Sequence, residues 1–174
     1  MSVINLYQKY IFVHIPKTGG TSIEAVIGGN GHMGVEDFAS MLDQNDDLCW
    51  DDFFSFAYVR NPYERLVSTY AFINKGMAGF EQTIASKLSN SGLYRPQNLF
   101  THINSTSSPI TIFRYENLDS DWGSVCKKLG WEKTILPHKR KSNHLHWSQY
   151  YNNQLKKEVL NFYQDDFRIF GYEH

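Results

Sequence analysis

The sequence predicts an α/β fold in which a central parallel sheet is covered by helices on both faces. Three short segments, 11–15, 53–59 and 109–114, are apolar and rich in β-branched or aromatic residues, as buried strands are. Each is followed by residues with helical spacing, and alternating strands and helices are typical of a parallel sheet. At 174 residues, we expect one domain, residues 1–174.

The helices are predicted from local signals. Apolar residues at i, i+3 and i+4 over 23–27 indicate a helix that Gly28 and Gly29 end. Asn61 is expected to cap the next helix and Pro62 to open it, because proline lacks the amide hydrogen that a first turn leaves unused. Further helices are expected to begin near Gly34, to span about 78–89 and 153–163, and to carry Trp122, Val125, Cys126 and Leu129 on one face.

Composition limits the function classes. A hydrophobic content of 41% and a net charge of −1 indicate a folded protein without the overall basic field that drives nonspecific nucleic-acid binding. The two cysteines have no zinc or redox spacing, and we expect Cys126 to be a buried thiol. The chain as given shows neither a basic leader nor an apolar run of membrane-spanning length. We therefore expect a soluble, cytoplasmic protein.

A glycine-containing loop follows the first strand. Ligands of parallel sheets bind beyond the carboxyl ends of the strands, so residues 16–22, 60–61 and 114–117 are expected on one rim. In the first of these, glycines permit close backbone approach and the following helix directs free N–H groups at a ligand. Lys17 adds a charge. The loop is either a cradle for a phosphate-like group or a simple glycine turn with a solvated lysine.

A second candidate anion site follows the second strand. Arg60 stands at its carboxyl end, and Ser68 is expected on the side of the next helix that faces away from the apolar stripe. Arg60 is either an anion ligand or half of a structural ion pair. The first loop reads PKTGGTS, which does not fit the G-x-x-x-x-G-K-[ST] pattern. Because neighbouring strands end in Arg60 and Arg114 instead of an acidic residue, we expect no metal site.

These motifs resemble those of the sulfotransferase superfamily. IPKTGGTS is similar to its 5′-phosphosulfate loop, and YVRNPYERLVSTY, over 58–70, is similar to its 3′-phosphate motif. With FRYENL downstream, over 113–118, the order resembles most closely the carbohydrate-type sulfotransferases related to heparan sulfate 2-O-sulfotransferase, including small bacterial members. The resemblance runs from about Ile11 to Tyr172. It implies a three-layer P-loop-like fold and the co-substrate 3′-phosphoadenosine 5′-phosphosulfate (PAPS), with PAP as product.

The resemblance also implies roles for individual residues. Tyr115 matches a tyrosine that contacts the adenosine in relatives, although a core aromatic is the alternative. The basic run 139–141 stands where the superfamily often closes over the 3′-phosphate; here no glycine follows the basic pair, and a solvated charge run is the alternative. Together the expected donor-binding residues are Lys17, Thr18, Gly19, Gly20, Thr21 and Ser22 for the 5′-phosphosulfate, and Arg60, Ser68, Tyr115, Arg140 and Lys141 for the remainder of the nucleotide.

A general base is needed to take the proton of the attacking acceptor, and histidine suits this role near neutral pH. His32, in GGNGHMGVEDF, lies where relatives place their catalytic histidine. His14 falls within the first strand and is expected to be buried structure. Glu36 is the alternative base, although we expect it to cap the helix that begins near Gly34. Lys17 is expected to neutralise charge on the departing phosphate oxygen.

The sequence therefore predicts a PAPS-dependent sulfotransferase that acts by in-line transfer to a hydroxyl or amine. We expect a carbohydrate or other polar small-molecule acceptor near segments 30–52 and 74–105, where polar side chains such as Gln97 could bind it. No nucleic-acid partner is expected, and the oligomeric state is not encoded in any pattern. The alternatives are a non-catalytic module that binds the nucleotide or a glycan, and a small-molecule kinase with a degenerate phosphate loop.

Overall fold

A computed structural model describes residues 2–29, 31–73, 79–89, 91–103, 108–132, 134–137 and 144–174. The chain divides into two compact units. The first, Met1–Val59 with Leu99–Lys139, contains the sheet and is called the sheet unit; the second, Arg60–Asn98 with Arg140–His174, is called the helical unit.

The sheet has four strands in the order β1-β2-β3-β4. Strands β2 (Tyr10–Val13), β3 (Phe54–Val59) and β4 (Thr111–Arg114) are parallel, with Phe12 paired to Phe56 and Ala57 to Ile112. This confirms the predicted α/β fold with its largely parallel central sheet flanked by helices. One strand was not predicted: β1 (Val3–Asn5) pairs antiparallel with β2 and forms an edge.

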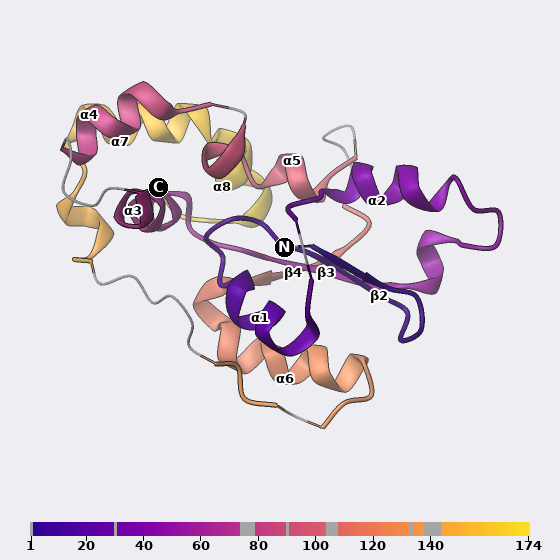
Figure 1. Cartoon of the computed structure of the whole chain (residues 1–174). Coiled ribbons are helices and arrows are strands. Elements are labelled where there is room, and N and C mark those ends of the chain that lie inside the picture. The colour runs from indigo at the N-terminus through magenta and orange to yellow at the C-terminus, as the bar shows by residue number, and fades with distance from the viewer. Residues whose placement is uncertain are drawn as a thin grey trace. The chain divides into compact units, whose positions relative to one another are not determined.

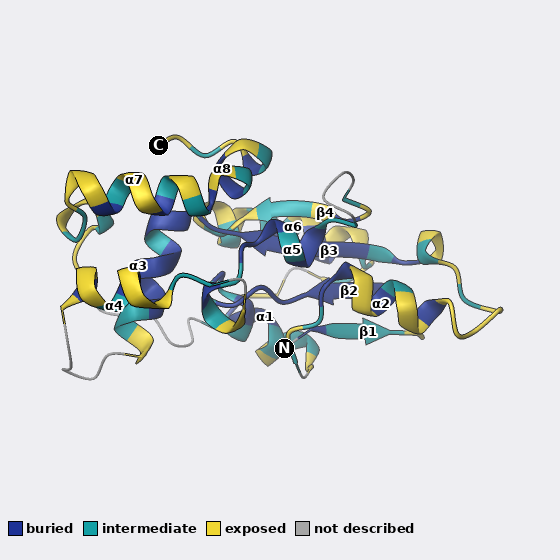
Figure 2. Cartoon of the chain, turned by 90° about the horizontal axis from the view of Figure 1, so that it is seen from above, coloured by how far each residue is buried: buried dark blue, intermediate teal, exposed yellow. Residues whose placement is uncertain are grey.

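Helices cover both faces of the sheet within the sheet unit. Figure 1 shows α1 (Gly20–Ile27) and α6 (Leu118–Lys128) on one face and α2 (Val35–Leu42) on the other. The inner strands β2 and β3 are consequently buried along nearly their whole length, whereas β1 is half-buried (Figure 2). One apolar cluster joins the sheet to α1 and α6, and its buried members are Tyr10, Phe12, Ile23, Phe56, Tyr58, Trp122, Val125, Cys126 and Leu136.

The helical unit is built around a second, strongly aromatic core. It contains α3 (Pro62–Ile73), α4 (Phe80–Lys87), α7 (Asn153–Phe162) and α8 (Gln164–Phe170); α5 (Asn98–Thr101) begins at its edge. Single-turn 3-10 helices occur in the chain at Trp50–Asp52, Gly92–Tyr94, Tyr115–Asn117 and Trp147–Gln149. The core of this unit consists of Tyr63, Leu66, Val67, Phe80, Ile84, Tyr94, Leu155, Val159, Tyr163 and Phe167.

The predicted start of α3 is confirmed. The Asn61 side chain accepts hydrogen bonds from the backbone N–H of Tyr63 at 2.9 Å and of Glu64 at 3.4 Å, and Pro62 is the first helical residue. These bonds satisfy two of the four N–H groups that a helix start leaves without an internal partner. Arg60, immediately before the cap, is thereby placed at the entry to the helix.

Candidate functional site

The loop after β2 turns sharply before α1. Lys17 has a positive φ of 70° although it is not a glycine, and Gly19 follows with a φ of 83°. The Thr18 hydroxyl donates a hydrogen bond of 2.9 Å to the carbonyl of Ile15, which closes the loop on itself. Thr18 is 1% exposed. Its hydroxyl therefore stabilises the loop, and of the groups of Thr18, which we expect at the 5′-phosphosulfate, the backbone amide is the one that remains for a ligand.

Gly19 lies against the segment that follows β4. A Cβ atom at Gly19 would lie 2.9 Å from side-chain carbons of Tyr115 and Leu118, so only glycine fits both this space and the positive φ. The loops after β2 and β4 are thus in contact at the carboxyl ends of their strands, as predicted. Tyr115 is half-buried beside the loop.

His14 supports the loop from within the protein. It is 5% exposed, as expected for a structural histidine, and its Nδ1 pairs with Oε1 of Glu24 on α1. A Cβ at Gly20 would lie 2.1 Å from Cδ2 of His14, so the imidazole packs directly on the backbone where α1 begins. Burial, with a smaller contribution from His32, lowers the pKa of His14 to about 3, and the ring is neutral at physiological pH. The sequence signal for this cluster is a polar residue within an apolar strand.

His32 reaches the same place from the segment before α2. Its Nδ1 lies 2.9 Å from the backbone carbonyl of His14, and the two imidazole centroids are 4.6 Å apart. A carbonyl oxygen only accepts, so Nδ1 carries the proton and Nε2 of neutral His32 is the basic nitrogen. The residue is exposed, but partial burial of its ring lowers the pKa of His32. It therefore remains an acceptor at neutral pH.

The expectation that Glu36 caps α2 is wrong. Asp37, one residue later, accepts a hydrogen bond of 2.7 Å from the backbone N–H of Gly34. Because the helix starts at Val35, Asp37 occupies the third helical position, from which a carboxylate reaches back to the residue that precedes the helix. Glu36 is exposed in the first turn.

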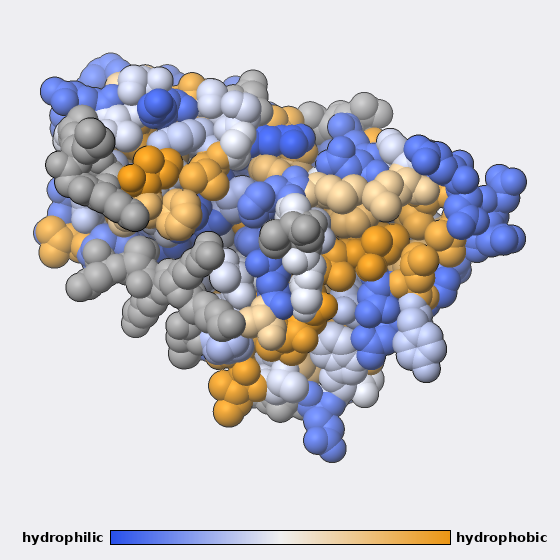
Figure 3. All heavy atoms as spheres, in the orientation of Figure 1, coloured by the Kyte–Doolittle hydropathy of each residue, from blue (hydrophilic) through white to orange (hydrophobic). Residues whose placement is uncertain are grey.

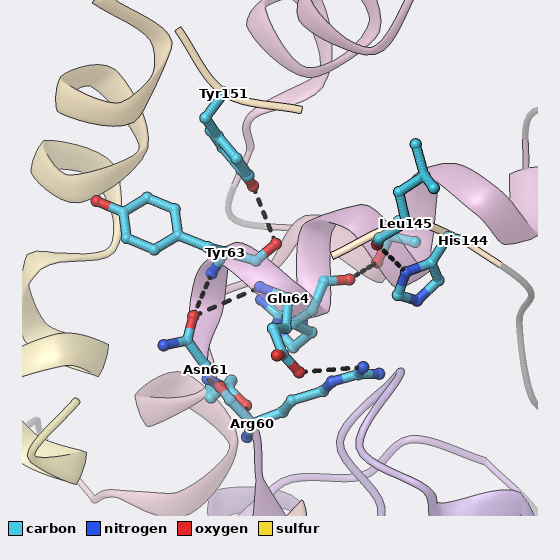
Figure 4. Close-up of polar contacts among 10 residues, drawn as sticks. Arg60, Asn61, Tyr63, Glu64, His144, Leu145 and Tyr151 are labelled. Atoms are coloured by element: carbon cyan, nitrogen blue, oxygen red, sulfur yellow. Dashed lines mark hydrogen bonds and ion pairs between the residues drawn. The ribbon is translucent and has the colours of Figure 1, made fainter. Parts of the chain in front are cut away.

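Arg60 is nearly buried in the helical unit, with 7% of its surface exposed. Its guanidinium Nη2 lies 3.4 Å from Oε2 of Glu64, one turn along α3 (Figure 4). Arg60 therefore forms an ion pair, which was one of the two roles that the sequence allowed for it. It does not exclude anion binding, because a guanidinium has five N–H donors in a planar fork that suits phosphate.

Two polar residues are less accessible than the sequence suggested. Ser68, expected on an open side of α3, is only 4% exposed. Gln97, considered as an acceptor ligand, is fully buried and its amide bonds to Arg60 and Asp166. Gln97 is therefore structural and unavailable to an acceptor.

The predicted ligands Arg140 and Lys141 lie outside the described residues.

The described residues contain neither a cluster of metal-ligating side chains nor a membrane-spanning helix. None of their His, Cys, Asp and Glu side chains gather in a group of three or more that could hold a metal ion. In that part of the chain, every helix is too short or too polar to cross a membrane. On the face of the molecule drawn in Figure 3, hydrophobic and hydrophilic residues are interspersed.

The chain matches a protein-family model and is similar to a solved structure. A family model described as "Sulfotransferase family" matches residues 2–173. The fold is similar to the crystal structure of mouse sulfotransferase SULT7A1 complexed with PAP, with a TM-score of 0.61 and 16% identity over 92% of this chain and 84% of that chain. No curated protein sequence matches the chain. At 16% identity the structural similarity shows only that the two proteins share a fold. The family to which the chain belongs is shown by the match to the family model.

Proposed function

Because the chain belongs to the sulfotransferase family, which matches it over residues 2–173, we propose that it moves the sulfuryl group of PAPS to a hydroxyl or amine of a carbohydrate or other polar metabolite. Family membership confirms the predicted PAPS-dependent sulfotransferase. That a structure with the same fold holds PAP supports PAPS as the co-substrate. We further propose that residues 1–174 act as one sulfotransferase domain.

The observation that carries the proposal is the junction at His14. Its ring packs on the backbone of Gly20 in the glycine loop, and its carbonyl accepts from Nδ1 of His32. The anion-binding loop and the candidate base are therefore held by one buried residue at the end of β2. A transferase needs such a fixed relation, since proton removal and charge stabilisation act on the two ends of one reacting group.

The loop is suited to the 5′-phosphosulfate. The sharp turn at Lys17 and Gly19 leads directly into α1, whose first N–H groups and positive dipole end favour an anion. Lys17, the loop amides and the Thr21 and Ser22 hydroxyls would bind the group. Of the other predicted ligands, Arg60 and Ser68 would bind the 3′-phosphate, Tyr115 would contact the adenosine, and Arg140 and Lys141 would close over the nucleotide.

His32 would act as the base through Nε2. PAPS supplies an activated sulfuryl group, whose bond to the nucleotide phosphate breaks as a new S–O or S–N bond forms to the acceptor. The acceptor's proton would move to Nε2 of His32, while the carbonyl of His14 holds Nδ1–H and keeps the ring oriented. Lys17 would neutralise the charge that grows on the departing phosphate oxygen.

Incubation with isotopically labelled PAPS and a panel of glycans, lipids and small metabolites tests the proposal. We expect label transfer to a polar acceptor and PAP release, measured by mass spectrometry. A protein that binds PAP but modifies no acceptor would indicate a binding module. Turnover of magnesium–ATP without any use of PAPS would indicate a kinase. Failure to bind PAP in calorimetry would overturn the assignment altogether.

A further inference from the structure

The buried side chain of Gln97 pairs with both main-chain polar groups of Arg60. Its Oε1 accepts a hydrogen bond from the Arg60 N–H at 2.8 Å, and its Nε2 donates to the Arg60 carbonyl at 2.9 Å. Gln97 has an exposed fraction of 0% and stands 37 residues from Arg60 in the sequence. Such two-point pairing fixes the plane and direction of the backbone it binds.

Asp166, on α8, in turn fixes Gln97. Its Oδ2 accepts from the backbone N–H of Gln97 at 2.8 Å and from Nε2 at 3.3 Å, while Oδ1 accepts from the N–H of Asn98 at 2.9 Å. Because a carboxylate cannot donate, Nε2 must face Asp166, and Oε1 is left to face the Arg60 N–H. Asp166 thus sets which way the Gln97 amide points.

Arg65 holds the chain just before Gln97. This fully buried guanidinium donates to the carbonyls of Leu93 at 3.2 Å and Arg95 at 2.9 Å. Burial raises the pKa of Asp166, and the charge of Arg65 and the hydrogen bonds from Gln97 and Asn98 oppose that rise. Buried polar groups are costly unless each has a partner. The Gln97 amide and the Asp166 carboxylate meet that condition, because each of their polar atoms is hydrogen-bonded, whereas Nε of Arg65 is buried without a hydrogen-bond partner among the described residues.

Arg60 gains most from this support. It lies between β3 and α3, in neither a strand nor a helix, so regular secondary structure does not hold its backbone. Its side chain then runs beside the first turn of α3 toward Glu64 (Figure 4). Bidentate phosphate binding requires that the guanidinium start from a fixed Cα position, because a small misplacement loses one of the two hydrogen bonds.

We propose that the buried pair Asp166–Gln97 is a positioning device that holds Arg60 for the 3′-phosphate of the donor nucleotide. The inference rests on the proposed function, because it takes Arg60 to bind that phosphate. Neither Gln97 nor Asp166 would touch the nucleotide. A merely structural network would affect stability alone, whereas a positioning network also sets how strongly the protein prefers nucleotides that carry a 3′-phosphate.

The test compares the dissociation constants of PAP and AMP, which differ only in the 3′-phosphate. The wild-type protein is expected to prefer PAP by about 10- to 100-fold, the range for charged hydrogen bonds. Gln97→Met keeps the length of the side chain but removes its hydrogen bonds. We expect it to reduce the preference by about tenfold, while AMP affinity changes by no more than about twofold, because AMP lacks the group that Arg60 would hold.

Four further variants make the result decisive. Val159→Ala, which truncates a fully buried residue of the same core, should lower stability and leave the preference unchanged. Arg60→Ala should abolish the preference, and adding Gln97→Met to it should change nothing more. If Gln97→Met does not fold, judged by circular dichroism, Asp166→Asn replaces it with the same expectation.

The outcomes separate the two proposals. Preference for PAP that depends on Arg60 but survives Gln97→Met or Asp166→Asn would overturn the positioning inference and leave the proposed function intact. A wild-type protein that binds PAP no better than AMP, or a preference retained by Arg60→Ala, would overturn the assignment of Arg60 itself, and the positioning inference with it.

Discussion

The two candidate anion sites differ in whether backbone or side-chain groups determine their geometry. In the sheet unit, the loop from Lys17 to Gly20 relies on backbone: two positive φ angles, the start of α1, and glycines with no space for a Cβ. In the helical unit, Arg60 relies on side chains, because a buried glutamine and aspartate hold its main chain. The first site is encoded within a few consecutive residues. The second is assembled from residues as far apart as 60 and 166.

The two sites should therefore respond differently to mutation. A site built from backbone is disrupted by adding side-chain atoms, because a methyl group at Gly20 would clash with the His14 ring. A site positioned by side chains is lost by removing hydrogen bonds, even at residues that never meet the ligand.

Removal of the reacting groups in the sheet unit should have the largest effect. His32→Ala and Lys17→Ala are each expected to lower kcat by about 100- to 1,000-fold, because each removes a proton acceptor or a charge that acts in the transition state. Steady-state transfer of label from PAPS measures this. Exposed Lys157 and His174 offer matched control substitutions to alanine.

The pH dependence of the wild-type rate sharpens the same prediction. Because the pKa of His32 is lowered by burial, its Nε2 stays unprotonated below the ordinary histidine range, and kcat should begin to fall only below about pH 6.5. Normal turnover by His32→Ala, or an acid limb that is unaltered in that variant, would contradict its role as the base.

Acid should destabilise the sheet unit through His14. Its pKa is about 3 in the folded protein and near 6.5 when unfolded, so between these values only the unfolded chain binds the proton. The free energy of unfolding should therefore fall by about 1.4 kcal/mol for each pH unit below 6.5, and show no contribution above it. Urea denaturation of wild type and His14→Asn from pH 8 to 4.5 measures the difference between their slopes. Equal slopes would contradict a buried neutral imidazole.

Arg60→Ala should weaken PAP binding by about 10- to 100-fold, because a charged phosphate contact is lost, while kcat at saturating PAPS falls much less. Isothermal titration calorimetry measures the affinity. Arg168→Ala is the matched control, since Arg168 is 71% exposed and pairs only locally with Asp165 in the same helix. If Arg60→Ala bound PAP as tightly as the wild-type protein, Arg60 would not be a phosphate ligand. Its role would then be the structural ion pair with Glu64.

Gly20→Ala should destabilise the protein by about 1–3 kcal/mol, the usual cost of overpacking, because its Cβ would meet the His14 ring at 2.1 Å. Urea denaturation at pH 8 measures the change. In a His14→Ala background the ring is gone, and the same substitution should cost less. Additive effects of the two substitutions would mean that the ring does not limit residue 20.

Much of the fold was readable because it depends on local patterns. The apolar segments predicted β2, β3 and β4 to within a few residues, and Asn61 with Pro62 predicted the start of α3. The three-residue strand β1 was not predicted, because so short a strand has little periodicity and it forms only by pairing with β2. The cap of α2 was assigned to Glu36 instead of Asp37, since a one-residue shift in a helix start changes which carboxylate reaches back.

The glycine loop before α1, the three parallel strands and the likeness to sulfotransferases were all predicted from the sequence, because each depends on residues that are neighbours in the chain. The roles of Thr18, Gln97 and Asp166 became visible in the folded protein: the Thr18 hydroxyl closes the loop, and Asp166 orients the buried Gln97 amide from 69 residues away. The physical reason is that periodicity and turn chemistry act over a few residues. Hydrogen bonds between distant side chains exist only once folding has brought them together.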